Sequence, residues 1–585
     1  MSFQHSAAIR ALAKPIAFVL LGALCAVAFA QPKPAGEAPD AGRVLEQTRE
    51  PLRLPPPSEP DLAPKPPEPK PALMPQPKLR VKVARFTFSG NTLIPEDELG
   101  QSVKEFVGKE LNFEGLNDAA TEARAYYRSR GYFLAQAYLP EQTIRGGVVE
   151  IAIIEGRWGI IELDKKPATR LSTRLLAGII GAHLQQGGVI TETGLERPLL
   201  LINDLPDATV TTELRPSETV GAANLRVNVD PGAGRMSGYV DADNYGNRFT
   251  GEYRYGISAS LNAPIGWGDR ASLRYFTTDE KMWYGRVAYD LPVTYYGTRL
   301  GASYSRFDYA LAKDFAFLQG TGEGEVTSGY LFHPITRTRN TNLILNAGYE
   351  DKKLIDRIES TTPVTRTETS ISTAKLGLVG DFRDGIFGGG LNAYSATYTW
   401  GNLGTSAAAA GTDVRNTQGN FYKWNADLRR QQRLTDEASV LLAFSGQWAS
   451  RNLGSAEKMS LGGPNGVRAY PVGEATADTG HVVQTELRYV VPGTKIFNGD
   501  LTFLGFFDYG WAKVNQIPAQ DAVTGVVTDS NNIRHISGSG LGGSVGKEGE
   551  FLLRIMAAWK FTQVDATSDT ARRVPRVWMQ GIKWF

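Results

Sequence analysis

The chain has 585 residues, with 63 lysines and arginines against 61 aspartates and glutamates, five histidines and one cysteine. A formal net charge of +2 gives no basic excess, so the composition excludes the electrostatic footprint of a nucleic-acid-binding protein. The scattered histidines lack a ligand spacing such as HExxH, and the single cysteine, Cys25, excludes an intramolecular disulfide or a multi-thiolate metal site.

Residues 1–30 have the pattern of a secretory signal peptide. Arg10 and Lys14 precede an apolar run that ends in AFA, so we expect cleavage after about Ala30. The alternative is a membrane anchor, but the apolar run is shorter than the ~20 residues that a spanning helix needs. A lipid anchor at Cys25 is also disfavoured, because a bulky residue precedes it.

A polar segment and a proline-rich segment follow. Residues 54–80 contain LPPPSEPDLAPKPPEPKPALMPQP, a composition that predicts an extended linker instead of a packed domain. Within residues 31–53, Asp40 is a good capping residue for a short helix near 40–50. Because so short a helix is marginal alone in water, we expect it to dock on another part of the protein.

Two successive stretches share one order of elements. In residues 81–156, VKVARFTFSG alternates as a strand, two helical stretches follow between Pro95 and Gly131, and YFLAQAYLP and VVEIAIIEG predict two more strands. Residues 157–231 repeat this β-α-α-β-β order, with GIIELD, ATVTTEL and NLRVNVD as the strands. An internal repeat of about 75 residues predicts two small α/β domains, each large enough for its own core.

From residue 232 to residue 585 the hydrophobic pattern changes to a period of two. In EYRYGISASLNA, every second residue from Tyr253 to Ala263 is apolar, and the residues between them are charged, polar or glycine. Similar segments recur at RASLRY, MWYGRVAYDL, NLILNAGYE, SVLLAFSGQW, VVQTELRYV and FLLRIMAAWKF. This stretch of about 350 residues predicts a membrane β-barrel of about sixteen antiparallel strands.

A soluble β-sandwich would alternate in the same way, but three features favour the barrel. The alternation runs longer than one sandwich domain usually extends. Aromatic residues lie at segment ends, where an interfacial girdle needs them. The chain ends in Trp584-Phe585, as outer-membrane barrels commonly do. We therefore expect the barrel to lie in outer-membrane lipid.

Four stretches resemble one family, in its order along the chain: GYFLAQAYLPEQTIRGGVVEIAIIEG, DADNYGNRFTGEYRYG, SLGGPNGVRAYPVGE and FLGFFDYGWA. They are similar to the end of the first polypeptide-transport-associated (POTRA) domain, the start of the barrel, the inward-folded loop and a later barrel strand of two-partner secretion transporters, the hemolysin activation/secretion protein family. The resemblance covers essentially all of the mature chain. It implies two periplasmic POTRA domains, at 81–156 and 157–231, before the barrel at 232–585.

The resemblance also implies a function and partners. A transporter of this family lies in the bacterial outer membrane and moves a large exoprotein, an adhesin or hemolysin with an N-terminal secretion domain, from the periplasm to the cell surface. Its barrel contacts lipid and is inserted by the barrel-assembly machinery. The resemblance further implies that the helix near 40–50 plugs the resting lumen, with residues 54–80 as its tether. We expect neither an enzymatic activity nor a cofactor.

The stretch GGPNGVRAYPVGE, in a loop expected near 455–480, places the cationic Arg468 among turn residues. Along FLGFFDYGW, Phe503 and Phe507 share the more aromatic face, which should meet lipid, so Asp508 should face the lumen. We expect the loop to fold into the barrel, where Arg468 and Asp508 form a bidentate pair; the resemblance implies the same pair. The alternative is an exposed loop arginine, worth under ~1 kcal/mol in a surface pair.

The predicted site residues are Gly466, Val467, Arg468 and Tyr470 in the loop and Phe506, Asp508 and Gly510 on the barrel strand. The family pattern has a glycine between the arginine and the aromatic residue, whereas this chain has Ala469. If that position requires a positive φ, alanine would carry a strain of roughly 1 kcal/mol.

Two other functions compete. A barrel-assembly insertase of the same superfamily would share the loop and the POTRA domains, but two POTRA domains and a plug-like helix count against it. An outer-membrane hydrolase would need a Ser–His pair or a metal group, and His333, His481 and His535 have no recognisable partners. The stretch GSGLGG from Gly538 matches GxGxxG, but a strand pattern follows it instead of a helix, so barrel glycines explain it.

Overall fold

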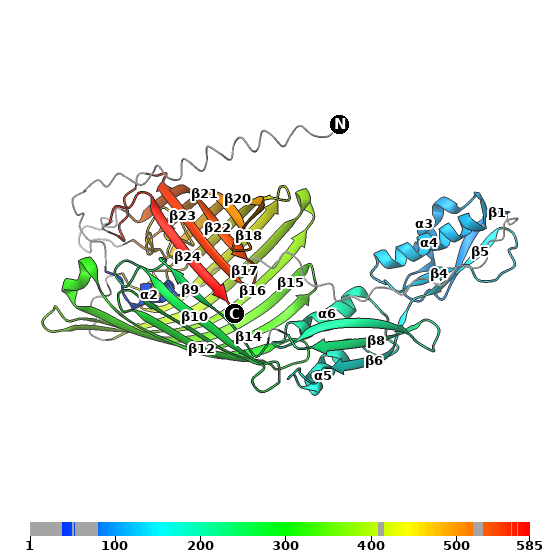
Figure 1. Ribbon diagram of the computed structural model, residues 1–585, viewed down its shortest axis with the longest axis horizontal. Coiled ribbons are helices and arrows are strands. Elements are labelled where there is room, and N and C mark those ends of the chain that lie inside the picture. Colours follow the sequence, from blue (N-terminus) through cyan, green and yellow to red (C-terminus); the bar gives the residue numbers. More distant parts are fainter. Residues whose placement is uncertain are drawn as a thin grey trace.

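A computed structural model of the chain describes residues 38–49, 52, 80–232, 234–406, 413, 415–518, 531–562, 564–569 and 571–585. The predicted signal peptide (1–30) lies outside the described residues, and so does the predicted linker (54–80) except for its last residue. Figure 1 shows a barrel at one end of the molecule and two smaller α/β units in a row at the other end.

The first α/β unit is a small sheet covered by helices. Its elements are β1 (Arg80–Lys82), β2 (Arg85–Ser89), α3 (Glu96–Ser102), the 3-10 helix η1 (Lys104–Phe106), β3 (Glu110–Asn112), α4 (Phe113–Ser129), β4 (Gln136–Tyr138) and β5 (Val148–Ile154). The main sheet has the order β2-β5-β4, while β1 pairs with β3. Helix α4 is capped by the Asn112 side chain, which accepts a hydrogen bond from Gly115 N at 2.9 Å. The predicted β-α-α-β-β order is confirmed, except that the first predicted strand is divided into β1 and β2 and that the short strand β3 is added.

The buried carboxylate of Glu155 holds the first unit together. It follows β5 and accepts hydrogen bonds from Thr92 N at 2.5 Å, Leu93 N at 2.6 Å and the Tyr127 hydroxyl at 3.0 Å. Burial of the Tyr127 side chain and its bond to Glu155 raise the pKa of that hydroxyl. One side chain therefore joins the loop after β2, the helix α4 and the end of the sheet.

We expect Glu155→Gln to destabilise the first unit by about 1–3 kcal/mol. The amide keeps one oxygen for the two backbone N–H groups, but it loses the charge that strengthens these bonds, and its NH2 group cannot accept from the Thr92 hydroxyl. The urea concentration at which trypsin cleaves this unit should fall by about 1 M. Glu150→Gln is the matched control, since Glu150 is half-buried on β5 and accepts from the Ser89 hydroxyl at 2.6 Å. Equal midpoints for the two variants would contradict the role given to Glu155.

The second α/β unit repeats the first around a core of leucine, isoleucine and valine side chains. Its elements are β6 (Arg157–Lys165), α5 (Thr173–His183), α6 (Glu192–Asn203), β7 (Thr209–Pro216) and β8 (Ala222–Asp230). The sheet order is β6-β8-β7, with β6 parallel and β7 antiparallel to β8. The prediction of the same β-α-α-β-β order is confirmed.

Sixteen antiparallel strands then close into a barrel, because β9 pairs with β24. The strands are β9 (Met236–Asp243), β10 (Arg254–Asn262), β11 (Arg270–Thr278), β12 (Trp283–Pro292), β13 (Arg299–Ala310), β14 (Gly320–Arg337), β15 (Thr341–Ile358), β16 (Thr365–Asp384), β17 (Gly390–Thr405), β18 (Gly419–Arg433), β19 (Ala438–Ala449), β20 (Thr479–Ile496), β21 (Gly499–Lys513), β22 (Ile533–Lys547), β23 (Phe551–Lys560) and β24 (Arg576–Trp584). Closure leaves no unpaired strand edge in the wall, and it confirms the predicted strand number.

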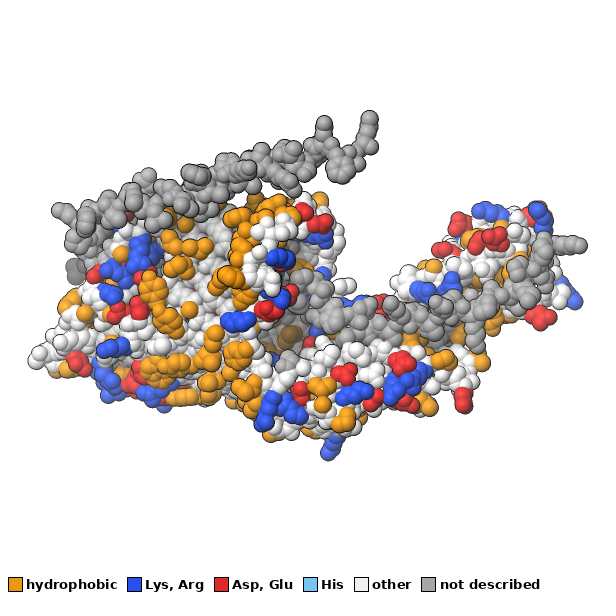
Figure 2. Space-filling view, in the orientation of Figure 1, with side chains coloured by type: hydrophobic (Ala, Val, Ile, Leu, Met, Phe, Trp, Pro, Cys, Tyr) orange, Lys and Arg blue, Asp and Glu red, His pale blue; other side chains and the backbone are white. Residues whose placement is uncertain are grey.

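The barrel wall has an apolar outer face and a polar inner face. On β21, Phe503 and Phe507 are exposed on the outer face, while Phe506 and Asp508 are buried on the inner face, as the alternation predicts. Figure 2 shows hydrophobic side chains across the outer wall on this side of the molecule. Among the described helices, none is long and apolar enough to cross a membrane.

The second α/β unit docks on the turn between β14 and β15. Arg337 donates to both carboxylate oxygens of Asp204 at 2.8 and 2.7 Å, and Arg339 pairs with Glu196 at 2.5 Å. Arg197 of α6 donates to the backbone carbonyls of Pro334 and Ile335, near the end of β14. These contacts define the end of the barrel that faces the α/β units.

The short helix α2 (Ala41–Glu46) lies inside the barrel outline in Figure 1 and contacts β14 and β15. Ala41 and Val44 are fully buried, and Ala41 N donates to Asp356 of β15 at 2.9 Å. The predicted helix is therefore present, and it is docked on the inner wall. Its role in closing the lumen remains a prediction.

Candidate functional site

The loop between β19 and β20, residues 450–478, turns into the lumen instead of extending away from the barrel. Its two arms bridge at Met459 and Ala477. The buried Glu474 fixes the returning arm, because it pairs with Arg534 of β22 at 2.5 Å and accepts from Ser568 N at 2.8 Å. The predicted inward fold near 455–480 is thus present in the structure.

Arg468 lies at the inner end of this loop, where it meets two carboxylates. Its Nε and Nη2 donate to the two oxygens of Asp508 at 2.9 and 2.7 Å, and its backbone N donates to the same carboxylate at 3.0 Å. Its remaining Nη1 donates to Glu486 of β20 at 2.5 Å. The side chains of Arg468, Asp508 and Glu486 are 4%, 0% and 5% exposed, so water competes little for these bonds.

Aromatic side chains complete the arginine site. The guanidinium carbon lies 3.6 Å from the centroid of the Phe506 ring, close enough for a strong cation–π contact. The Arg468 carbonyl accepts from Trp578 Nε1 of β24 at 2.7 Å. Sequence reasoning named Arg468, Asp508 and Phe506 but missed Glu486 and Trp578.

The other predicted loop residues lie around this pair. The Gly466 carbonyl accepts from Gln484 Nε2 at 2.8 Å. A Cβ on Gly510 would lie 3.1 Å from the Val467 side chain, so the glycine makes room for the loop. Tyr470 is fully buried, and its hydroxyl donates to the Val564 carbonyl at 2.9 Å.

Ala469 does not carry the strain that a positive φ would cause. It is absent from the described non-glycine residues with a positive φ, and it is 2% exposed. A Cβ built on Gly538 of β22 would collide with the Ala469 methyl group. The glycine on the facing strand therefore accommodates the alanine in the loop.

Gly538 belongs to the GxGxxG match, which lies within strand β22, as predicted from its barrel context. A Cβ on the next inward-facing glycine, Gly540, would collide with the Phe506 ring, and one on Gly542 would lie 3.0 Å from Leu504. These glycines leave space for side chains in and beside the arginine site, and this packing explains the GxGxxG match without a nucleotide. Within the described residues no group of three or more His, Cys, Asp and Glu side chains could hold a metal ion.

A second buried charge cluster fixes the other arm of the loop. Glu457 pairs with Lys352 of β15 at 2.5 Å and Lys423 of β18 at 2.8 Å. The adjacent Ala456 carbonyl accepts from Arg49 Nη2, just after α2, at 2.8 Å. The helix and the loop therefore form one unit against the wall.

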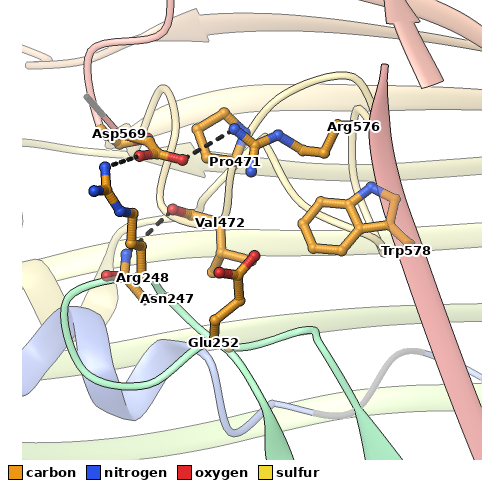
Figure 3. Close-up of a pocket in the computed structure, with 10 residues that line it drawn as sticks. Asn247, Arg248, Glu252, Pro471, Val472, Asp569, Arg576 and Trp578 are labelled. Atoms are coloured by element: carbon orange, nitrogen blue, oxygen red, sulfur yellow. Dashed lines mark hydrogen bonds and ion pairs between the residues drawn. The ribbon is translucent and has the colours of Figure 1, made fainter. Parts of the chain in front are cut away.

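At the outer end of the lumen the loop meets the β9–β10 and β23–β24 connections. In Figure 3, Asn247 points at the Val472 carbonyl, 3.3 Å from its Nδ2, and Asp569 lies between Arg248 and Arg576. The Asp569 carboxylate accepts from these two arginines at 3.3 and 3.0 Å. The loop is thus anchored along its whole length by charged and polar side chains.

A closed sixteen-stranded barrel, an inward loop with a buried arginine pair and two α/β units at one end form the architecture that the sequence resemblance implies for a POTRA–barrel transporter. The loop belongs to no strand and is held in the lumen by ion pairs.

The chain belongs to the haemolysin secretion/activation protein family: the model of "Haemolysin secretion/activation protein ShlB/FhaC/HecB" matches residues 221–531. The ShlB-type POTRA domain model matches residues 81–156. These matches confirm the predicted family, the predicted outer-membrane location and the periplasmic place of the POTRA region.

Curated relatives agree with the family. The heme/hemopexin transporter protein HuxB of Haemophilus influenzae strain 86-028NP is 29% identical over 500 residues, 85% of each chain. The protein of the same name from strain Rd is 30% identical over 441 residues, 74% of this chain and 76% of that one. The outer membrane transporter CdiB of Dickeya dadantii is 24% identical over 437 residues, 72% and 75% of the two chains.

Solved structures show the same fold. CdiB from Escherichia coli matches with a TM-score of 0.67 and 20% identity, over 89% of this chain and 94% of that one. BamA from Haemophilus ducreyi lacking POTRA domains 1–3 matches with a TM-score of 0.50 and 13% identity, over 87% of this chain and all of that one. The comparisons favour a secretion transporter over an insertase, because the family and the curated relatives are secretion and transport proteins.

Proposed function

We propose that the chain recognises an unfolded exoprotein in the periplasm and passes it through the barrel lumen to the cell surface, as the transporter of a two-partner secretion system. The observation that carries this proposal is the Arg468–Asp508–Glu486 network. It holds a loop that is not part of the wall, so the loop can move within the lumen while the closed barrel stays intact.

The partner is proposed from the names of the relatives. HuxB is named for heme and hemopexin, and the relative from Serratia marcescens is a "Hemolysin transporter protein". A large adhesin- or hemolysin-type exoprotein with an N-terminal secretion domain is therefore the proposed cargo. A heme- or hemopexin-related exoprotein is the first candidate.

Capture of the cargo is proposed at the free sheet edges of the two α/β units. In the sheet orders β2-β5-β4 and β6-β8-β7, each outer strand pairs on one side only. Such an edge presents backbone N–H and C=O groups to which an extended polypeptide can add as another strand. The two edges in succession would lead the chain to the mouth of the barrel.

Helix α2 is proposed to close the resting lumen together with the loop. Its buried face rests on the wall through Ala41, and Arg49, just after the helix, donates to the loop. Transport through this lumen needs neither a catalytic residue nor a cofactor, so the chain is proposed not to be an enzyme. Outer-membrane lipid surrounds the wall, and the barrel-assembly machinery is the proposed route of insertion.

Deletion of the gene tests the function. The exoprotein should disappear from the medium and be degraded in the periplasm, while the other outer-membrane proteins keep their normal amounts. A general loss of outer-membrane barrels would favour the insertase instead.

A further inference from the structure

Three lumenal arginines follow one local pattern on three strands, a pattern that they share with Arg274 of β11, which pairs with Asp241. In each case a lipid-facing leucine precedes the arginine: Leu428-Arg429 on β18, Leu487-Arg488 on β20 and Leu553-Arg554 on β23. The three leucines are 55%, 52% and 48% exposed on the outer wall. Since successive side chains of a strand point to opposite faces, the three arginines face the lumen.

These arginines lie next to the Arg468 site, on the side toward the α/β units. Glu486, which binds Arg468, also accepts from Arg488 Nε at 2.6 Å. Arg554 is two residues from Met556, whose sulfur lies 3.7 Å from Arg468 Nη1. Arg488 Nη1 lies 3.4 Å from Oε1 of Gln431, the next inward-facing residue after Arg429 on β18. The three side chains therefore form one cluster, which we call the arginine track (Arg429, Arg488 and Arg554).

The arginine track has more cations than bound carboxylates. Throughout the described part of the chain, no carboxylate forms an ion pair with Arg429 or Arg554, and Arg554 Nε is buried without a hydrogen-bond partner. Asp427, two residues before Arg429 on β18, accepts from the hydroxyls of Ser395 and Ser445 at 2.9 and 2.7 Å. A shielded guanidinium that lacks an acceptor is costly unless a ligand supplies one.

We infer that the arginine track is a binding site for carboxylates, and that it takes the acidic side chains of an extended polypeptide as they pass through the lumen. A guanidinium binds a carboxylate through two parallel hydrogen bonds, so an acidic side chain fits the free donors of Arg429 and Arg554. The three arginines attract anions whether or not an exoprotein is in the lumen. The assignment to a passing polypeptide rests on the proposed function.

The position of the track links an arriving acid to the loop. Glu486 is shared between Arg488 of the track and Arg468 of the loop. A carboxylate that binds Arg488 competes with Glu486 and so changes the charge balance around Arg468. The track therefore lies between the α/β units and the Arg468 site, on the path of a chain that enters the lumen from that end.

The potential in the lumen can be measured with one introduced thiol. Ser544 of β22 is directly opposite Arg554 in the strand register, so its side chain shares the lumenal face. The only natural cysteine is Cys25, in the predicted signal peptide, so Ser544→Cys in the full chain gives one reporter thiol after cleavage. The modification rates by an anionic and a cationic methanethiosulfonate of similar size give a ratio that reports the local potential.

We expect the anionic reagent to react faster. Replacing both Arg429 and Arg554 by Gln should lower the anionic-to-cationic ratio about tenfold at low salt, because potentials of a few kT act on both reagents with opposite sign. Arg430→Gln is the matched control, since Arg430 is the next residue on β18, lies on the outer face and pairs with Asp384. Arg554→Lys keeps the positive charge and should therefore keep the reagent ratio. If Arg554 acted only through the packing of its guanidinium group, Arg554→Lys would change the ratio as Gln does.

A peptide competition tests the ligand. A glutamate-rich peptide should protect the reporter thiol of Ser544→Cys from the neutral reagent methyl methanethiosulfonate more than a lysine-rich peptide does, and the double Gln variant should lose this difference.

An unchanged reagent ratio in the double variant, or a thiol that no reagent reaches, would overturn the site. Protection by chloride or phosphate alone would restrict it to small anions and overturn the polypeptide assignment. Normal export with an unchanged ratio would leave the proposed function standing, whereas a gene deletion that does not impair export would refute that function and not the anion site.

Discussion

The variants Arg468→Ala and Asp508→Ala are expected to yield folded, membrane-inserted barrels that secrete less than a tenth of the normal amount of exoprotein. Removing one partner of a buried ion pair leaves the other charge uncompensated, which costs about 3–5 kcal/mol. Since about 1.4 kcal/mol changes an equilibrium tenfold, that cost shifts the loop away from its docked position by about a hundredfold or more. The wall keeps its sixteen paired strands, because neither side chain takes part in a backbone ladder.

The effect should be larger for Arg468 than for Asp508. Loss of Arg468 leaves two carboxylates at the site, although Glu486 keeps its bond to Arg488. Loss of Asp508 leaves Arg468 with Glu486 as its acceptor. Arg468→Lys should be intermediate, because an ammonium cannot reproduce the bonds of Nε and Nη2 to one carboxylate.

Secreted exoprotein in the medium, measured against the amount of heat-modifiable barrel in the membrane, checks this result. Arg430→Ala is the control, since Arg430 also binds both oxygens of an aspartate, Asp384, but on the outer face of the wall. Normal export by both Arg468→Ala and Asp508→Ala would exclude the pair from transport.

The variant Gly42→Leu is expected to open the lumen. Gly42 lies against the loop, and a Cβ at that position would collide with the Ser455 hydroxyl and the Ala456 backbone nitrogen. A leucine cannot fit there without moving the helix, and overpacking of this kind costs about 1–3 kcal/mol. The ratio of docked to released helix should therefore fall up to about a hundredfold. The released state frees the space that α2 occupies beside β14 and β15.

Planar-bilayer conductance measures the opening: Gly42→Leu channels should be open for a much larger share of the time, at higher conductance, than those of the unaltered chain. Gln47→Leu adds the same side chain just after α2, where the residue is only partly buried, and should leave the conductance unchanged. Equal open times for Gly42→Leu and Gln47→Leu would show that α2 does not close the lumen.

Strand alternation was enough to predict the inner face of β21, and hence the position of Asp508. The same alternation in VVQTELRYV places Glu486 on the inner face beside Arg488, but Arg468 could have met any inward acid near its level. Which one it meets depends on the register of non-adjacent strands and on the path of the loop. Trp578 could not be predicted for the same reason, because it follows Arg468 by 110 residues and meets it only after the barrel closes.

Local sequence also predicted helix α2, but it did not predict where the helix docks on the barrel wall. Asp40 caps the helix through the Arg43 N–H at 2.9 Å, as a capping residue should. The helix is positioned by the bond from Ala41 N to Asp356, a residue 315 positions further along the chain. The strain considered for Ala469 does not arise, because its φ is not positive. Room for its methyl group comes from Gly538, a tertiary contact that a family pattern in the loop does not contain.

Crosslinking of a stalled exoprotein tests the central claim, transport through the lumen, most directly. A partner fused to a stably folded domain should stall during export, and a cysteine in its threaded part should form a disulfide with Ser272→Cys, on the inner face of β11. It should form none with Leu273→Cys, the next residue, which is 45% exposed on the outer face. Crosslinks at position 273 and not at 272, or continued export without any lumenal crosslink, would contradict passage through the barrel.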